Sequence, residues 1–259
     1  MDDPRGWSVD EVAPGVFVAT ATLFTTTTTV VASGDGGCLV IDPAVTVAEL
    51  AALARWFPAR GLRPAVGWST HPHWDHMLWS RALGDVVRYA TAGAVAAAEA
   101  DLPRQVRELT RAAPGHDLSL FARLTPLSHT DVVPWDGPTA VVLPHDAHAP
   151  GHGAVFLPGT GVLIAGDMCS DIEIPLLDLQ SPDPFGAYRH GLGLLERVPD
   201  VRVVVPGHGH VADRAGFRRR IAADFRYLDA AEAGRDPADP RLREDWLRAE
   251  HERQRDFSG

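Results

Sequence analysis

The 259-residue sequence contains no lysine and no asparagine, and its only cysteines are Cys38 and Cys169. Without lysine, Schiff-base catalysis and a phosphate-loop lysine are excluded, and without asparagine so is an asparagine oxyanion donor. Two cysteines cannot form a disulfide framework, which fits a reducing compartment. No stretch approaches the roughly 18 apolar residues of a membrane span, and the acidic start lacks a basic patch followed by an apolar run. We therefore expect a cytoplasmic protein that does not enter a membrane.

The negative net charge of the chain disfavours polyanions as binding partners. Its formal net charge is -10, and no basic groove stands out in the sequence, so nucleic acid is not an expected partner. The hydrophobic fraction of 45% is ordinary for a globular domain. We expect one domain over residues 1–259 with a charged helical tail from about 236 to 259, acting on a small-molecule substrate. No sequence feature fixes an oligomeric state.

Strand and helix patterns alternate along the chain. Beta-branched and apolar runs predict strands at 15–20, 25–33, 38–42, 65–69, 86–90, 139–143, 154–158, 161–166 and 201–206. Apolar residues at helical spacing predict helices at 47–60, 92–100, 104–113, 184–197 and 215–233. The five threonines at 25–29 fit a strand or strand edge, or alternatively a pocket wall of hydroxyls. Prolines break the stretch 102–138, which is either a lid over the site or a surface excursion.

The segment His71-Pro72-His73-Trp74-Asp75-His76 contains the strongest chemical signal. Pro72 disfavours a helix, so this segment is predicted to be a loop and not a helical zinc motif. In an extended loop His71, His73 and Asp75 point to one side and His76 to the other. A tight turn would bring both sets around a pair of ions, so we expect the adjacent Asp75 and His76 to serve a different metal ion from His71 and His73. Imidazole suits zinc, iron or nickel, and a carboxylate adds a harder ligand.

Three further candidate ligands follow predicted strands or tight turns. His152 and His208 lie in two copies of Pro-Gly-His-Gly, and Asp167 follows the strand 161–166. Strand ends hold side chains rigidly at one rim, and glycine lets the backbone turn closely beneath a metal. These residues are predicted to complete a site built from separate strand ends.

With these motifs the chain resembles the metallo-beta-lactamase superfamily over about residues 16–211. The motifs are LVIDP at 39–43, the HxHxDH signature, PGHG, LIAGD and VVVPGHG. The resemblance implies an α/β fold, a four-layer αββα sandwich, with the metals at one edge of the sheets. It implies a first metal held by His71, His73 and His152, a second held by Asp75, His76 and His208, and Asp167 bridging the two.

Departures from the family pattern narrow the expected activity. The best-known lactamases have a cysteine at the bridging position, whereas this chain has Asp167, and their substrate-binding lysine and asparagine are absent. Flavodiiron oxidoreductases have a glutamate where His73 stands. Quorum-lactone hydrolases tend to have a tyrosine just after the bridging aspartate, but here Tyr188 is more distant. These differences disfavour a dedicated lactamase and a flavodiiron enzyme.

Three functions remain open. In the first, a dinuclear zinc hydrolase with two zinc ions per chain uses a metal-bridging hydroxide to cleave a small ester, thioester, lactone or amide. Asp75 would then be the catalytic residue that orients the water. In the second, a mononuclear iron oxygenase of the persulfide dioxygenase type uses His71, His152 and Asp167. The third is a catalytically silent scaffold, disfavoured because every ligand position is filled.

Residues near the motifs receive secondary roles. Asp42 is expected either to hydrogen-bond a ligand imidazole or the ligand loop, or to have a structural role beside the turn. Structural or pocket-wall roles are expected for His145, His148 and His210, a buried thiol for Cys169, and a pocket-wall or core position for Trp68, Trp74 and Trp79. The acidic residues Asp171, Glu173 and Asp178 are either a solvated loop or a group that repels anionic substrates.

Overall fold

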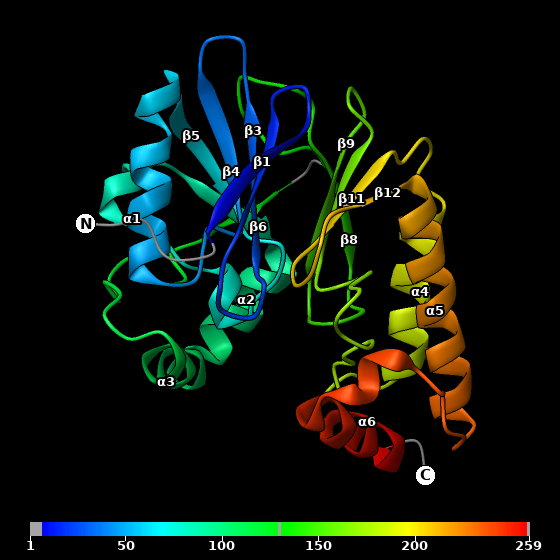
Figure 1. Ribbon diagram of the computed structural model, residues 1–259. Helices are drawn as coiled ribbons and strands as arrows, with labels where there is room; N and C mark the ends of the chain where they lie inside the picture. Colours follow the sequence, from blue (N-terminus) through cyan, green and yellow to red (C-terminus); the bar gives the residue numbers. More distant parts are fainter. Residues whose placement is uncertain (1–6, 129–130, 258–259) are drawn as a thin grey trace.

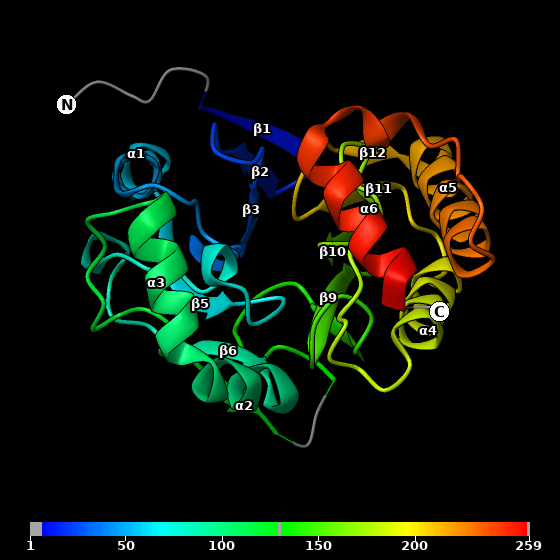
Figure 2. The same cartoon turned by 90° about the horizontal axis from the view of Figure 1, so that it is seen from below.

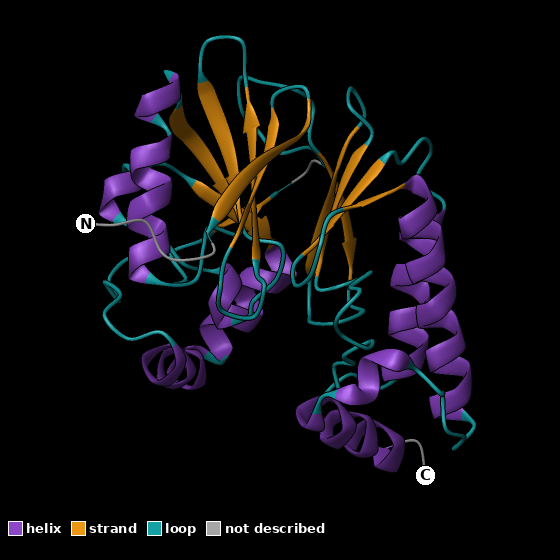
Figure 3. Ribbon diagram, viewed as in Figure 1, coloured by secondary structure: helices purple, strands orange, loops and turns teal. Residues whose placement is uncertain are grey.

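Two β-sheets face each other in the computed structural model, which describes residues 7–128 and 131–257 (Figures 1 and 3). The first sheet has seven strands in sequence order, β1 to β7. They are β1 (Ser8–Ala13), β2 (Val16–Thr20), β3 (Thr27–Ala32), β4 (Gly37–Ile41), β5 (Arg63–Trp68), β6 (Arg88–Thr91) and β7 (Thr125–Leu127). The second sheet has five strands in the order β12-β11-β10-β9-β8. They are β8 (Val141–His145), β9 (His152–Leu157), β10 (Val162–Gly166), β11 (Val203–Pro206) and β12 (Ala212–Asp213).

Helices cover the outer face of each sheet (Figure 2). The helices α1 (Val47–Trp56), α2 (Ala92–Ala100) and α3 (Leu102–Ala112) lie outside the first sheet, and α4 (Pro184–Glu196) and α5 (Arg214–Glu232) lie outside the second. The last helix, α6 (Asp245–Phe257), packs near the end of α5 (Figure 1). This arrangement confirms the predicted αββα sandwich. No helix within the described ranges is long and apolar enough to cross a bilayer.

Three apolar layers separate the four structural layers. Between the sheets, Val18 and Ile41 of the first sheet belong to the same buried cluster as Val155 and Ile164 of the second. A second cluster lies beneath α1, and a third packs α4 and α5 onto the outer face of the second sheet. Strands that are covered on both faces read as continuous apolar runs, and this explains sequences such as VLIAG at residues 162–166.

The helix boundaries follow local chemistry. Thr46 and Glu49 form a capping box at the start of α1, and the same glutamate accepts a hydrogen bond from the backbone N–H of Thr22. The predicted helix over 47–60 was too long, because α1 ends at Trp56 and Pro58 begins a separate 3₁₀ turn, Pro58–Arg60. Gly61 closes that turn in the left-handed conformation, with φ of 69°.

Three short strands were not predicted. Strand β1 carries exposed charged residues instead of an apolar run, and β7 and β12 contain only three and two residues. Through β7, part of the stretch 102–138 joins the edge of the first sheet, and Val133 packs between the sheets. Residues 129 and 130 of this stretch lie outside the described residues. The charged tail is helical, as predicted, in the 3₁₀ turn Pro240–Arg243 and in α6.

Parallel pairing brings four strand ends together at one edge. Strand β4 runs parallel to β5 in the first sheet, and β10 runs parallel to β11 in the second. Their carboxyl ends lead directly to Asp42, His71, Asp167 and His208, respectively. The topology thus places side chains that are up to 166 residues apart in sequence along one rim.

Candidate metal centre

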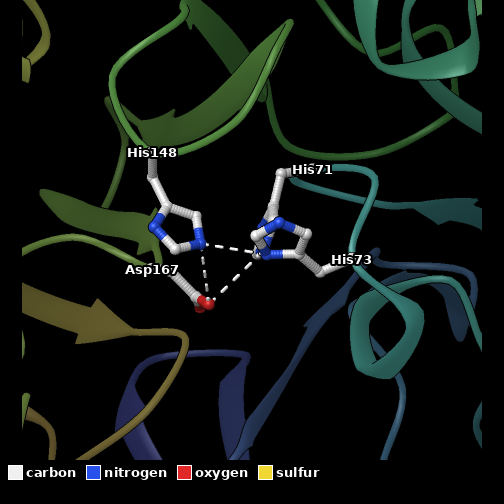
Figure 4. A group of neighbouring side chains, drawn as sticks. All are labelled: His71, His73, His148 and Asp167. Carbon is white, nitrogen blue, oxygen red and sulfur yellow. Dashed lines mark hydrogen bonds and ion pairs between the residues drawn. The ribbon is translucent and has the colours of Figure 1, made fainter. Parts of the chain in front are cut away.

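The first group of potential ligands comprises His71, His73, His148 and Asp167, whose ligand atoms all lie within 4.8 Å of one another. Figure 4 shows the three imidazoles and the carboxylate pointing toward a common point. The Nδ1 atom of His73 is 3.1 Å from Nε2 of His71 and 3.0 Å from Nε2 of His148. Oδ2 of Asp167 is 3.3 Å from Nε2 of His71 and 3.4 Å from Nε2 of His148.

The second group comprises Asp75, His76 and His208. Nε2 of His208 is 3.2 Å from Oδ2 of Asp75 and 3.3 Å from Nε2 of His76. The 3₁₀ turn Trp74–His76 follows His73 directly and separates the two groups along the chain. A fully extended loop would place Asp75 on the side of His71 and His73, so it is this turn that groups Asp75 with His76.

Asp167 contacts both groups. Its Oδ1 atom is 3.2 Å from Nε2 of His76, and its Oδ2 atom is 3.2 Å from Nε2 of His208 and 3.3 Å from Nε2 of His71. Oδ1 is buried, and among the described residues it has no hydrogen-bond donor besides this contact with His76. A buried carboxylate that lies between two clusters of imidazole nitrogens has the position required of a bridging ligand.

The structure corrects one expected ligand position. His152 is the first residue of β9 and belongs to neither group, whereas His148, in the loop before that strand, takes the place expected for it. The ring of His152 is stacked between those of His71 and His145, at centroid distances of 5.1 and 4.4 Å. Within residues 7–128 and 131–257, neither of its nitrogens has a hydrogen-bond partner. The reason is the strand: His152 pairs with His145 across β8 and β9, which buries its side chain behind the centre.

One sequence signal could have identified His148. The predicted strand begins two residues after His152, so a slight extension of that strand includes this histidine. His148 lies four residues upstream, before Pro150 and Gly151, and is therefore the histidine that sits in a loop. Loop residues are free to curve over a site, while the side-chain directions of a strand are fixed by its pairing.

Four of the imidazoles share one orienting arrangement. Nδ1 of His148 donates to the carbonyl of Leu176 at 2.8 Å, and Nδ1 of His208 lies 3.1 Å from the carbonyl of Phe24. Nδ1 of His76 donates to Asp42 at 2.9 Å, and Nδ1 of His71 contacts the hydroxyl of Thr70 at 3.0 Å. In each ring the occupied Nδ1 leaves Nε2 directed at the centre. Protein metal ligands commonly show this arrangement, because the outer hydrogen bond fixes the tautomer and the ring orientation.

Asp42 anchors the ligand loop, one of the two roles expected for it. Its Oδ1 accepts the backbone N–H of Thr70 at 2.8 Å, and its Oδ2 accepts the hydroxyl of Thr70 at 2.6 Å besides the N–H of His76. The carboxylate is 2% exposed, and the residue has a φ of 48°. A non-glycine residue held in the left-handed region costs free energy, which is offset here by the three accepted hydrogen bonds.

Thr26 and Thr27 hold the loop that carries His208. Oγ1 of Thr26 is 3.2 Å from Nδ1 of His208, and Oγ1 of Thr27 donates to the carbonyl of Pro206 at 2.6 Å. Thr27 begins β3, which agrees with the prediction of a strand or strand edge for the threonine run. Contact between its hydroxyls and the ligand loop was not predicted, because no local pattern indicates which later segment a strand edge meets.

Burial and neighbouring charges divide the histidines into two sets. Burial lowers the pKa of His73 well below its usual value and that of His71 to about 4, so both are neutral at pH 7. Burial acts in the same direction on His76 and His208, but the neighbouring carboxylates, Asp167 foremost, outweigh it and raise both pKa values well above the usual one. The protein without metal therefore stores protons on the two imidazoles that face carboxylates.

The remaining candidates lie outside both groups. Cys169 is buried, and burial raises its pKa well above the usual value, so the thiol is protonated. Tyr188 is buried in the core between α4 and the second sheet. His210 is bound to Asp171 at 2.9 Å, and burial lowers the pKa of His145 to about 3. Trp74, with 9% of its surface exposed, makes an edge contact with Phe24.

The acidic residues after Asp167 do not act as one patch. Asp171 is paired with Arg220 at 3.3 Å, and its carboxylate also accepts the backbone N–H of His210 at 2.9 Å. Glu173 is half-buried, and burial raises the pKa of its carboxyl to about 7, although the nearby His208 lowers it. Asp171 is thus a structural residue, while Glu173 is a carboxyl close to the metal centre.

Sequence and structure comparisons agree with this geometry. The sequence profile of the Metallo-beta-lactamase superfamily matches residues 21–208. The chain belongs to this superfamily. The match spans the ligand motifs from Asp42 to His208, as the resemblance in the sequence indicated. No curated protein sequence matches the chain.

Solved metallo-beta-lactamase structures share the fold at low sequence identity. A beta-lactamase domain protein from Burkholderia ambifaria has a TM-score of 0.66 and 22% identity, over 87% of this chain and 76% of that one. A metallo-beta-lactamase family protein from Thermus thermophilus has a TM-score of 0.65 and 21% identity, over 85% and 81%. A stereoselective inverting sec-alkylsulfatase from Pseudomonas sp. has a TM-score of 0.69 and 17% identity, over 88% of this chain and 42% of that one.

Proposed function

We propose that this metallo-beta-lactamase superfamily protein is a hydrolase that holds two zinc ions and cleaves a small ester, thioester, lactone or amide. The observation that supports it most directly is the position of Asp167 between two groups of inward-facing imidazole nitrogens. His71, His73 and His148 would hold one ion and Asp75, His76 and His208 the other, with Asp167 shared. Imidazole nitrogen with carboxylate oxygen is a donor set that suits zinc.

The chain's own residues supply orientation and a fixed arrangement of charge. When bound, a metal pair lowers the pKa of water toward neutrality and polarises the oxygen of the bond to be cleaved. Asp75 is 7% exposed, and in the protein without metal the cationic His76 and His208 hold its pKa well below the usual value despite burial. A bound metal cation would supply the same attraction once these histidines have released their protons. The carboxylate of Asp75 is therefore ionised at neutral pH and accepts a hydrogen bond from an attacking water. We assign it the positioning of that water.

The absence of lysine and asparagine supports small neutral substrates over the substrates of the lactamases. The structural neighbours include proteins described as metallo-beta-lactamases and an alkylsulfatase, so the fold accommodates more than one hydrolytic reaction. Glu173, close to the centre, further disfavours strongly anionic substrates whenever its carboxyl is ionised. Esters, thioesters, lactones and amides remain the classes that we propose.

Metal analysis of matched histidine variants tests the ligand assignment. We expect about two zinc ions per chain in the unmodified protein, and loss of at least one in the variant His148→Ala. The matched variant His152→Ala should keep both ions, because its ring belongs to neither group. Full metal content in His148→Ala together with loss in His152→Ala would reverse the assignment.

Activity measurements test the reaction class. We expect zinc-loaded protein to hydrolyse at least one reporter among esters, thioesters, lactones and amides, and Asp75→Ala to abolish that turnover while leaving the circular dichroism spectrum unchanged. One iron per chain with oxygen uptake would contradict the hydrolase and favour the oxygenase.

A further inference from the structure

A pocket of about 420 Å³ lies between α5 and residues 237–241. This segment runs into the 3₁₀ turn Pro240–Arg243. None of the proposed metal ligands lines it. Its volume falls in the range of sites that bind small molecules. The pocket is therefore separate from the metal centre and large enough for a ligand of its own.

Part of the pocket lining on α5 consists of small residues, which leave room between the side chains of Arg219 and Arg226. Arg219, Ala223 and Arg226 follow one another at the i, i+4 and i+7 spacing, so they share one face of the helix. Ala212 and Gly216 extend the same lining toward β12. Because these residues carry at most a methyl group, the space between the arginines stays open.

Four arginines line the pocket, and they fall into two kinds. Arg241 is held by Asp224 at 2.6 Å and by Asp239 at 2.7 Å, and Arg220 donates to the carbonyl of His210 at 2.8 Å. Arg219 and Arg226 are exposed and make no hydrogen bond or ion pair among residues 7–128 and 131–257. Arg241 and Arg220 therefore form part of the pocket wall, whereas the N–H groups of Arg219 and Arg226 can donate to a ligand.

The charge of the pocket is opposite to that of the protein as a whole. The chain has a formal net charge of -10, yet four arginines and only two carboxylates, Asp171 and Asp239, line this pocket. A third carboxylate, Asp224, is buried behind Arg241 and is matched by it. Arg226 lies near enough to Asp239 to lower the pKa of that carboxyl, but neither Arg219 nor Arg226 makes a hydrogen bond or ion pair within the described ranges. Each therefore presents a planar fork of donors that can attract an anion.

We propose that this pocket binds a small anion that carries a phosphate group, held between Arg219 and Arg226. A guanidinium group donates two parallel hydrogen bonds to a pair of oxygen atoms. A phosphate group has enough oxygens to accept such pairs from both arginines, whereas a carboxylate has only two oxygens. Both inorganic phosphate and a phosphate monoester have this chemistry. The site goes beyond the proposed hydrolase function and does not depend on it.

The pocket also shares a wall with the loop that follows Asp167. Ser170 lines the pocket and donates its hydroxyl to the carbonyl of His208 at 2.7 Å. Phosphate could also contact bound metal at the nearby centre, so binding to the whole protein does not identify the site. Substitutions on α5 distinguish the two, because they leave every proposed metal ligand unchanged.

Equilibrium dialysis with radiolabelled inorganic phosphate on the full-length, metal-loaded protein tests the proposal. We expect Arg219→Gln and Arg226→Gln each to weaken phosphate binding about tenfold, and the double variant to abolish this class of site. The matched control is Arg218→Gln, an exposed arginine on the same helix that does not line the pocket, and it should bind like the unmodified protein. Phosphate binding that is unchanged in the double variant, or equally weakened in Arg218→Gln, would overturn the proposal.

Competition separates the two sources of phosphate. Glycerol 1-phosphate that displaces labelled phosphate more strongly than unlabelled phosphate does would identify a monoester site, and weaker displacement would identify inorganic phosphate as the preferred ligand. Thermal unfolding of each variant provides the folding control. Arg219 and Arg226 make no ion pair in the described parts of the chain, so both variants should unfold within a few degrees of the unmodified protein.

Discussion

Replacing Asp42 with asparagine tests how the outer hydrogen bonds control the metal centre. The substitution keeps the size of the side chain, and the remaining oxygen can still accept the backbone N–H of Thr70. The new NH₂ group cannot accept from the Thr70 hydroxyl or from Nδ1 of His76, both of which now donate to Oδ2. If the NH₂ group donates to Nδ1 instead, the proton of His76 moves to Nε2, the atom that faces the centre.

Two magnitudes follow from this geometry. Loss of an outer-shell partner of a metal-ligating histidine typically weakens metal affinity by about 10–100-fold, which corresponds to roughly 1.4–2.7 kcal/mol. The buried hydroxyl of Thr70 loses its acceptor, which costs about 1–3 kcal/mol in the free energy of unfolding. We expect Asp42→Asn to lower both quantities, and Asp42→Ala to lower stability further because the backbone N–H of Thr70 also loses its acceptor.

The assays are zinc titration against a competing chelator and urea unfolding of the chelated protein. The matched control is Asp200→Asn, because Asp200 also has a positive φ, of 55°, but its side chain is 81% exposed and is paired with Arg214 instead of a proposed ligand. The control should leave both quantities nearly unchanged. Zinc affinity in Asp42→Asn equal to that of the unmodified protein would refute the idea that Asp42 sets the tautomer of His76.

Further predictions concern protons and backbone space. Because carboxylates raise the pKa of His76 and His208 well above the usual value, both are protonated at pH 7 without metal and lose these protons when zinc binds. Zinc affinity should therefore rise with pH, and calorimetry in buffers of different ionisation enthalpy should detect about two protons released; no release would contradict the pKa directions. At Gly151, with φ of 66°, an added Cβ would lie 2.2 Å from the backbone nitrogen of Ala94, whereas at Gly61, with φ of 69°, it would meet open space. Gly151→Ala should thus lower the free energy of unfolding by several kcal/mol and Gly61→Ala by only about 1 kcal/mol, and equal losses in urea unfolding would show that φ alone decides.

The sequence by itself determined most of the strands and helices, and it proposed seven ligands, of which the structure brings all but His152 into two groups. Apolar runs such as VLIAG, and helical spacing as in α1, depend only on whether the chain can bury one face or both, and this is a local property. Pro72 also excludes an α-helix at the start of the hexapeptide, so the sequence predicts a loop there. The grouping of Asp75 with His76 depends on the 3₁₀ turn Trp74–His76, because a fully extended loop would place Asp75 with His71 and His73.

The tertiary structure decided which of two nearby histidines reaches the centre, and the only local hint was that His152 lies beside a predicted strand. His148 and His152 are four residues apart in similar surroundings, and the pairing of β8 with β9 buries the second and frees the first. The partners of the ligand nitrogens were equally hidden, because Asp42, Phe24 and Leu176 meet them only where separate strand ends converge. The local sequence pattern specifies whether a segment forms a helix or a strand. Long-range strand pairing specifies which side chains from distant segments meet.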